Sequence, residues 1–516
     1  MLCVRRRGTL TDMLQAWRQL TLLGAAAVLL GMTSSAAAQT WWDDDWTHRR
    51  PVEVEQYRAT RLSGEDLAVV TMPVTGDMQP GGEDIRVIAS DGDVCEHRVL
   101  QVGPGDQVTV TLAPLDGPSA YQVYWGNPDA EAPETPLEIK RGVLQETWAY
   151  RGGAIKTFED VQAVFEKAVV KIGCGFRPTV FQGFNPFGPQ DSVASQFTAY
   201  FEVPADGEYI FCISSQNASF LEIDDELLLS NGGRHGPQRD VTIQETITLS
   251  KGLHKARFYH VSPNGNPIVV LAWQPPGATR IWPMATTDFT SVAHAEPGQI
   301  DLRDTRETID FLPQHIGEAF AREHYFQKYQ FDAMTDSTSR GKVTWEWDFG
   351  DGLTAEGESV SHVYLADGDY TVTLKRITRQ GVQERSYRIV VERPWELVTR
   401  QEVDDAGDYA QQVSAYDVDT LNPEGLAGAI LLFDGTDRSQ DATRAGRALL
   451  AGDTLPVATA IEAMFVLTEQ SRADGNSQTA VDALVKASGK VDAAEIVAGM
   501  LIYAADVTLT DLGDAD

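Results

Sequence analysis

Two aspartates and two histidines in this sequence have types and spacing that could suggest catalysis or metal binding. Asp348 and Asp351 lie three residues apart in a Trp-Asp-Phe-Gly-Asp-Gly run, and two carboxylates about 5 to 10 Å apart can hydrolyse glycosides. Because the run is typical of a strand that enters a tight turn, we expect both carboxylates to brace the turn by hydrogen bonds instead. His315 and His324 lack the spacing of His-Glu-x-x-His, so they predict a solvated connector and not a metal pair.

One loop supplies further candidates from residue type alone. Residues 231–237 read Asn-Gly-Gly-Arg-His-Gly-Pro, and loops carry binding residues more often than cores do. Arg234 and His235 are therefore candidate ligand-binding residues. The sequence contains no Gly-x-Ser-x-Gly elbow, Walker loop, paired Cys motif or His-Glu-x-x-His, which favours a protein that is not an enzyme.

The chain is long and acidic. Its 75 Asp and Glu residues against 42 Lys and Arg residues give a formal net charge of −33, which argues against a nucleic-acid partner because such binding needs clustered cations. A chain of 516 residues should hold roughly three to four domains, since a single core rarely grows beyond about 250 residues.

Residues 1–38 have the pattern of a signal peptide. Arginines at positions 5–7 precede an apolar run from Leu20 to Met32, and Ala36 and Ala38 fit the small positions before a cleavage site. The run is shorter than the about 20 apolar residues that a membrane span needs. We therefore expect a secreted, periplasmic or cell-surface protein without a membrane span in its mature chain, with a retained anchor as the alternative.

Three cysteines, Cys95, Cys174 and Cys212, would remain after such a cleavage. Cys174 and Cys212 fall in one expected domain and could pair in an oxidising compartment, or all three could be small core residues. Because the count is odd, at least one thiol has no intramolecular partner.

Residues 39–128 predict a first antiparallel β-sandwich. The stretches 84–88 and 108–112 alternate as half-buried strands do, with turns rich in Gly and Asp between them. The Trp-rich opening, an Arg-Arg-Pro-Val motif and a closing Tyr-Trp-Gly-Asn-Pro motif resemble DUF2341, a β-sandwich family of bacterial exported proteins, and this resemblance implies no activity. The opening residues Trp41, Trp42 and Trp46 can pack at a core or stack on sugar rings.

A linker rich in Pro and acids at 129–140 leads to a second sandwich at 141–290. The order Gly-x-Tyr-x-Phe, Leu-x-Ile-Asp, Leu-x-x-Gly-x-His and Leu-x-Trp-x-Pro-Pro-Gly is similar to the PA14 family, whose members include glycan-binding modules. Some PA14-like lectins hold Ca²⁺ with adjacent Asp residues, and this resemblance makes Asp224 and Asp225 candidate calcium ligands. The alternative is a turn in which both carboxylates accept local backbone hydrogen bonds.

Residues 291–328 are expected to form a helix-like connector, and residues 329–394 a third, smaller sandwich. Large apolar residues alternate along a strand that ends at Asp348, and Gly350 and Gly352 suit the positive φ angles of the turn that follows. The Trp-Asp-Phe-Gly-Asp-Gly run, Ser-His-Val-Tyr and Gly-Asp-Tyr-Thr-Val-Thr-Leu occur in the order of a PKD domain, an immunoglobulin-like module. This resemblance implies a spacer or adhesive role.

Residues 422–516 become rich in Ala and Leu at helical spacing. Asn422-Pro423 and Asn476-Ser477 open two of roughly five helices, which short Gly and Asp turns join. The pattern resembles stacked helical hairpins, which present surfaces that bind proteins. We therefore expect this region to dock a protein partner.

The sequence as a whole predicts a mainly β fold of tandem β-sandwich domains, one of them immunoglobulin-like, followed by an α-helical hairpin region. We expect an exported, non-catalytic protein that binds glycans or proteins at the cell envelope or surface, with Ca²⁺ as a candidate cofactor. One alternative is an accessory region of an extracellular polysaccharide-degrading enzyme. Another is an envelope spacer with no small ligand.

Overall fold

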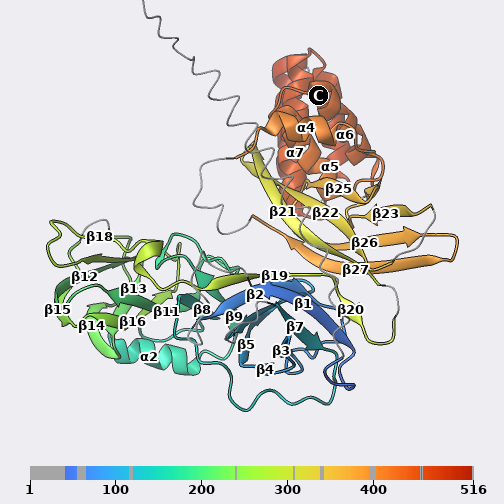
Figure 1. The fold of residues 1–516 in the computed structure, drawn as a ribbon. Coiled ribbons are helices and arrows are strands. Elements are labelled where there is room, and N and C mark those ends of the chain that lie inside the picture. Colours follow the sequence, from blue (N-terminus) through green and yellow to red (C-terminus); the bar gives the residue numbers. More distant parts are fainter. Residues whose placement is uncertain are drawn as a thin grey trace, which may run out of the picture. The chain divides into compact units, whose positions relative to one another are not determined.

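The computed structural model describes residues 41–54, 66–114, 120–238, 241–305, 308–337, 342–393, 403–453, 455 and 457–513. Among these residues the fold is mainly β, with several sheets followed by a helical region (Figure 1), as the sequence predicts. The signal peptide predicted at 1–38 lies outside the described residues.

The first β-sandwich draws its strands from two distant parts of the chain. They are β1 (His48–Val54), β2 (Ala68–Pro73), β3 (Arg86–Ala89), β4 (Val94–Cys95), β5 (His97–Val102), β6 (Gln107–Leu112), β7 (Ala120–Trp125), β19 (Ala293–Pro297) and β20 (Asp301–Leu302). The hydrogen-bonded order is β4-β3-β7-β1-β19-β2-β6-β5, and β20 also pairs with β1. Strand β19 joins the two halves because it runs antiparallel to β1 and parallel to β2.

The position of β19 corrects the connector expected at 291–328. This segment is not helix-like: it forms β19 and β20 and then enters a long strand of the third sandwich. Ala293 and Ala295 are buried with Val52 and Val70 in the core of the first sandwich. The first sandwich is therefore incomplete within 39–128, and the second sandwich is inserted between β7 and β19.

The second sandwich has two sheets, ordered β14-β13-β16-β11-β8-β9 and β10-β17-β12-β15, with β18 paired to β17. Its strands are β8 (Val143–Ala149), β9 (Lys171–Arg177), β10 (Phe181–Gln182), β11 (Val193–Val203), β12 (Gly207–Ser215), β13 (Ala218–Ile223), β14 (Glu226–Asn231), β15 (Gln244–Leu249), β16 (Gly252–Ser262), β17 (Val269–Gln274) and β18 (Trp282–Pro283). Helix α2 (Phe158–Lys167) begins after Thr157, whose hydroxyl accepts a hydrogen bond from the backbone N–H of Asp160. A 3₁₀ turn follows at Thr286–Asp288.

The cysteines behave as core residues. Cys95, Cys174 and Cys212 are all buried and outside any disulfide. Cys174 lies in β9 and Cys212 in β12, which belong to different sheets. Desolvation by burial raises the pKa of Cys95 and of Cys174 to about 12, so both thiols stay protonated at neutral pH.

The third sandwich consists of the sheets β21-β22-β25 and β24-β23-β26-β27. Its strands are β21 (Ile309–Ala321), β22 (His324–Thr335), β23 (Thr344–Asp348), β24 (Thr354–Glu356), β25 (Ser359–Tyr364), β26 (Gly368–Ile377) and β27 (Val382–Val391). Gly350 and Gly352 have φ angles of 81° and 99°, which confirms the turn predicted after β23. The sandwich begins at Ile309, earlier than the residue 329 that its motifs suggest.

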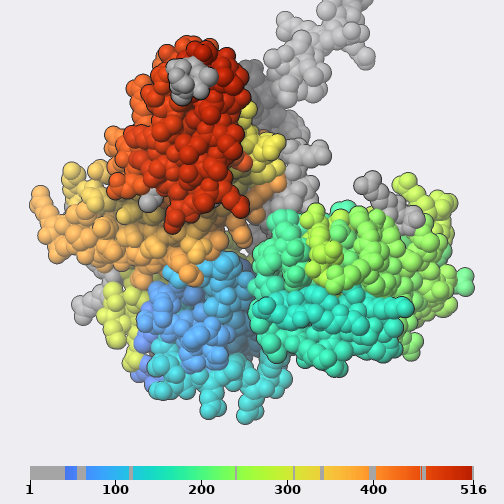
Figure 2. Space-filling model, turned by 180° about the vertical axis from the view of Figure 1, so that it is seen from behind, coloured from blue at the N-terminus to red at the C-terminus, as the bar shows by residue number. Residues whose placement is uncertain are grey.

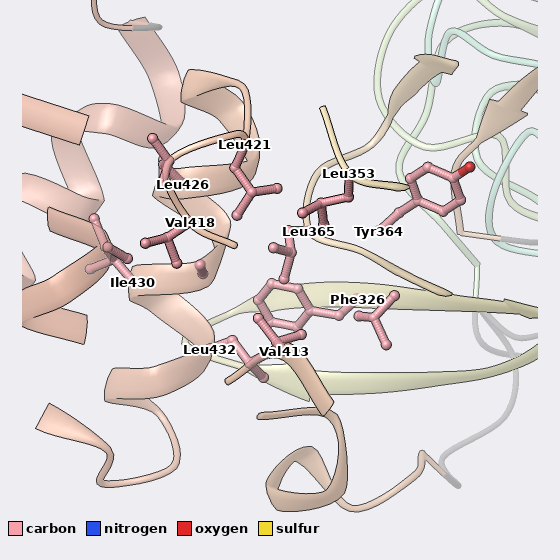
Figure 3. Close-up of a cluster of buried hydrophobic side chains, with 14 of the residues drawn as sticks. Phe326, Leu353, Tyr364, Leu365, Val413, Val418, Leu421, Leu426, Ile430 and Leu432 are labelled. Carbon is pink, nitrogen blue, oxygen red and sulfur yellow. The ribbon is translucent and has the colours of Figure 1, made fainter. Parts of the chain in front are cut away.

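The C-terminal helices pack onto the third sandwich and share its core. They are α4 (Ala406–Val413), α5 (Pro423–Asp434), α6 (Ser439–Ala451), α7 (Val457–Ala473), α8 (Ser477–Ser488) and α9 (Ala494–Val507), with a π-helical turn at Thr508–Leu512. Within the described ranges, five of these helices follow residue 422, as predicted, and α4 precedes them. Figure 3 shows Phe326 and Leu365 of the sandwich meeting Val413, Leu426 and Ile430 of the helices in one apolar cluster.

Candidate functional site

Asp224 and Asp225 form the two-residue turn between β13 and β14. Both have positive φ angles, 51° and 67°, as a tight hairpin turn of this length requires. Asp224 Oδ2 lies 2.6 Å from His254 Nδ1. Lys255 Nζ and Arg257 Nη2 each donate to Asp225 at 2.7 Å. The hydrogen bond from Lys255, reinforced by the Arg257 charge, lowers the pKa of Asp225.

These contacts do not fit a calcium site at Asp224 and Asp225. Calcium takes about six to eight oxygen ligands, whereas both carboxylates face basic side chains of β16. Across the described ranges, no group of three or more His, Cys, Asp and Glu side chains is placed to hold a metal ion. Both residues therefore lie at a turn, as the alternative expects, but their carboxylates bind β16 and not the local backbone of the turn.

Arg234 and His235 lie at the other end of the same hairpin. The backbone N–H of Asn217, just before β13, donates to the carbonyl of His235 at 3.0 Å, whereas Asp224 follows the end of that strand. Six residues of strand separate the two ends by about 20 Å. Arg234 is exposed and His235 is half-buried, and the loop does not converge with the aspartates on one surface.

A cleft on the second sandwich brings together two tryptophans that sequence reasoning did not select as site residues. Trp273 on β17 pairs across the strands with Trp282 on β18. The cleft has a volume of about 600 Å³, within the range of sites that enclose small ligands. Its lining includes Arg141, Glu202, Trp273, Trp282, Asp288 and Phe289. We call these six residues the indole cleft.

The indole cleft combines apolar surface with polar groups. Trp282 is half-buried, and Glu202 is exposed. Trp273 is 4% exposed, and its indole N–H has no hydrogen-bond partner within the described ranges. A buried polar group normally has a partner, and this N–H is an unpaired donor within the core of the second sandwich. Two tryptophans nine residues apart around a Pro-Pro-Gly turn were the sequence signal for this site.

Asp348 and Asp351 brace the turn of the third sandwich, as predicted. Asp348 Oδ1 accepts from the N–H of Gly350, and Asp351 Oδ1 from that of Leu353, both at 3.0 Å. The other oxygen of Asp351 lies 2.7 Å from His362 Nε2. Asp351 and His362 are both buried, so this pair is part of the core. The sequence showed no sign that His362 would be its partner.

The remaining candidates have structural partners. His315 Nε2 lies 2.8 Å from the Gln327 side-chain oxygen, and His324 contacts Glu462 of α7. The two histidines therefore do not share a site. Trp46 is buried and donates its indole N–H to the carbonyl of Asp84 at 2.7 Å. Its ring therefore packs in the first sandwich, which is one of the two alternatives stated for the opening tryptophans.

Comparison with known families identifies two of the domains. The PA14 domain family matches residues 182–284, and the PKD domain family matches residues 322–392. The chain therefore carries a PA14 domain in its second sandwich and a PKD domain in its third. No curated protein matches the chain.

The solved structures that match parts of the chain are distant in sequence. The PA14 domain of the antifreeze protein MpAFP is 11% identical, with 32% of this chain and 97% of that chain covered and a TM-score of 0.27. The PA14 sugar-binding domain of an RTX adhesin is 15% identical, with 30% of this chain and 99% of that chain covered and a TM-score of 0.26. The PKD1 domain of Vibrio anguillarum Epp is 20% identical, with 18% of this chain and 100% of that chain covered and a TM-score of 0.15.

The described helices give one further observation. None of them is both long and apolar enough to cross a lipid bilayer.

Proposed function

We propose that this protein is an exported, non-catalytic glycan-binding protein and that the indole cleft of its PA14 domain is the ligand site. The observation that carries the proposal is the cleft itself, in which two indoles lie beside side chains of both charges. A sugar presents an apolar C–H face and a rim of hydroxyl groups. Aromatic rings with a few polar groups are the chemistry that such a ligand needs.

Each side chain of the cleft has a role in this proposal. Trp282 supplies the partly exposed ring that packs on the sugar face. Glu202 and Asp288 accept hydrogen bonds from sugar hydroxyls, while Arg141 donates them. Because no metal ligand set is involved, binding does not require calcium.

The other modules support binding at the cell surface. PA14 and PKD domains are typical of extracellular proteins, and the predicted signal peptide provides for export. In this proposal the PKD domain has the spacer or adhesive role that its family implies. The buried pairing of Asp351 with His362 supports a structural role for that carboxylate.

Glycan-array screening of the full chain in Ca²⁺ and in EDTA tests the proposal. We expect binding to at least one glycan class at equal strength in both buffers. Trp282→Ala should weaken the affinity about tenfold or more, equivalent to about 1.4 kcal/mol. Trp148→Ala is the matched control, because Trp148 is a half-buried tryptophan on β8 outside the cleft.

Three results would count against the proposal. Absence of binding in both buffers would remove the glycan function, and loss of binding in EDTA would show that a metal takes part. Release of reducing sugar from a polysaccharide by the purified chain would contradict its non-catalytic part.

A further inference from the structure

Helix α9 is apolar on all sides, although only one side is buried. Every residue from Ile496 to Ala505 is apolar or glycine, with the hydroxyl of Tyr503 as the one polar side-chain group. Met500, Ala504 and Val507 are buried within the helical region. A helix that is apolar all round is normally buried all round, so α9 has an apolar side that the described residues leave exposed.

The uncovered side forms a continuous stripe. Leu501 is 44% exposed, Ile502 70% and Leu509 59%. Ala498 and Ala505 share this side, because residues three, four and seven apart lie on one helix face. We call these five residues, four from α9 and Leu509 from the π-helical turn after it, the α9 face. Figure 2 shows the surface of the C-terminal helices, in red, from behind the view of Figure 1.

Helix α5 shows how the same region accommodates an equally apolar helix. Every residue of α5 from Gly425 to Phe433 is buried, because α4, α6 and α7 all pack against it. Within the described ranges, α9 has α8 as its one extensive helical neighbour. One additional helix packed on the α9 face would therefore bury α9 to the same extent as its neighbours bury α5.

The charged residues along α9 indicate which kind of helix would cover the α9 face. Residues 491–512 contain acidic side chains but no Lys or Arg. Glu495 and Asp506 are exposed and lie along one edge of the α9 face, about three turns or 16 Å apart. In a symmetric antiparallel pair of α9 helices, this edge would meet its own copy. Like charges would then face each other, and the net charge of −33 would add to the repulsion.

We propose that the α9 face docks an amphipathic helix of another protein, one whose apolar stripe is edged by Lys or Arg residues about three turns apart. Leu501, Ile502 and Leu509 supply the apolar contact, as in other helix-in-groove interfaces. Glu495 and Asp506 select the basic partner and set its register. This interface is separate from the indole cleft and does not depend on the glycan function.

The test uses the full chain and a synthetic amphipathic peptide of about 20 residues, with Leu and Ala on one face and two edge lysines eleven residues apart. Fluorescence anisotropy should show saturable binding that weakens as salt is raised. Replacing both lysines by Glu should weaken binding at least tenfold. Ile502→Asp should do the same, whereas Val382→Asp, at a similarly exposed valine of the PKD domain, should have no effect.

Charge reversal on the protein gives the sharpest result. The double variant Glu495→Lys with Asp506→Lys should prefer the Glu peptide over the Lys peptide, which a merely adhesive apolar surface would not do. Failure of the Lys peptide to bind, or equal binding of both peptides, overturns the proposal.

The same variants distinguish two other possible partners of the α9 face, a second copy of the chain and a membrane. A dimer in sedimentation that Ile502→Asp abolishes would assign the face to a second copy. Binding to phosphatidylcholine vesicles that the same variant abolishes would assign it to a membrane. Either result overturns the proposal, while glycan binding by Ile502→Asp reports separately on the indole cleft.

Discussion

Burial decides the protonation of His260 on β16. Its Nε2 donates to the carbonyl of Gln216 at 2.8 Å. Desolvation lowers the pKa of His260 from 6.5 to about 4, and the nearby His235 adds to the lowering. The folded state therefore holds a neutral imidazole, whereas the unfolded state takes up a proton once the pH falls below 6.5.

The PA14 domain should accordingly lose stability in mild acid. The contribution of His260 is fully present above pH 6.5 and declines as the pH falls towards 4, by about 2 kcal/mol between pH 7 and pH 5. His260→Gln removes the titrating group and should flatten this pH dependence. Urea unfolding followed by tryptophan fluorescence at pH 7, 6 and 5 measures it, and equal slopes for both proteins would contradict the assignment.

Asp351 and Asp348 differ in burial, and their variants should differ in stability. Asp351→Ala leaves buried His362 without its carboxylate and removes a turn hydrogen bond, so we expect a loss of about 3 kcal/mol. Asp348→Ala removes one exposed hydrogen bond to Gly350 and should cost about 1 kcal/mol or less. Chemical denaturation of the PKD domain measures both, and equal losses would refute the buried pairing.

Among single elements, α5 and α9 show that the same substitution can have opposite effects. Gly428 of α5 lies against the backbone of the PKD domain, where an added Cβ would overlap the carbonyl oxygen of Leu365. Gly499 of α9 has open space around the corresponding position. Helix propensity alone would favour alanine at both positions.

We expect Gly428→Ala to destabilise the protein by about 1 to 3 kcal/mol, because α5 must move away from the sandwich. Gly499→Ala should stabilise α9 by about 0.5 to 1 kcal/mol. Thermal unfolding of the two variants measures this difference in sign. A stabilising Gly428→Ala would show that the helices do not pack on the PKD domain at this residue.

For the whole molecule, β19 is the strand that defines the first sandwich. Deletion of 293–302 should unfold this sandwich, because β1 and β2 lose their shared neighbour. Replacement of the inserted 141–290 by a short Gly/Ser linker should leave it folded. Hydrogen exchange of the β1 amides distinguishes the two variants, and protection that survives the first deletion would contradict the discontinuous domain.

Features that depend on neighbours in the chain were predictable from sequence. Alternation and turn glycines marked β23 and the Gly350–Gly352 turn, and helical periodicity with an Asn-Pro start marked α5. The positions of Asp224 and Asp225 were predicted at a turn for the same local reason. Their hydrogen bonds to β16, thirty residues away, were not.

The mainly β fold and the helical region that follows it were therefore predictable from sequence alone. Only the tertiary structure decided where β19 pairs, which histidine faces Asp351, how Trp273 and Trp282 shape one cleft and which side of α9 stays open. Propensity and periodicity act over a few residues, whereas these four features depend on which distant surfaces exclude water together. No local pattern carries that information, because short alanine-containing strands such as β19 have a weak signal of their own.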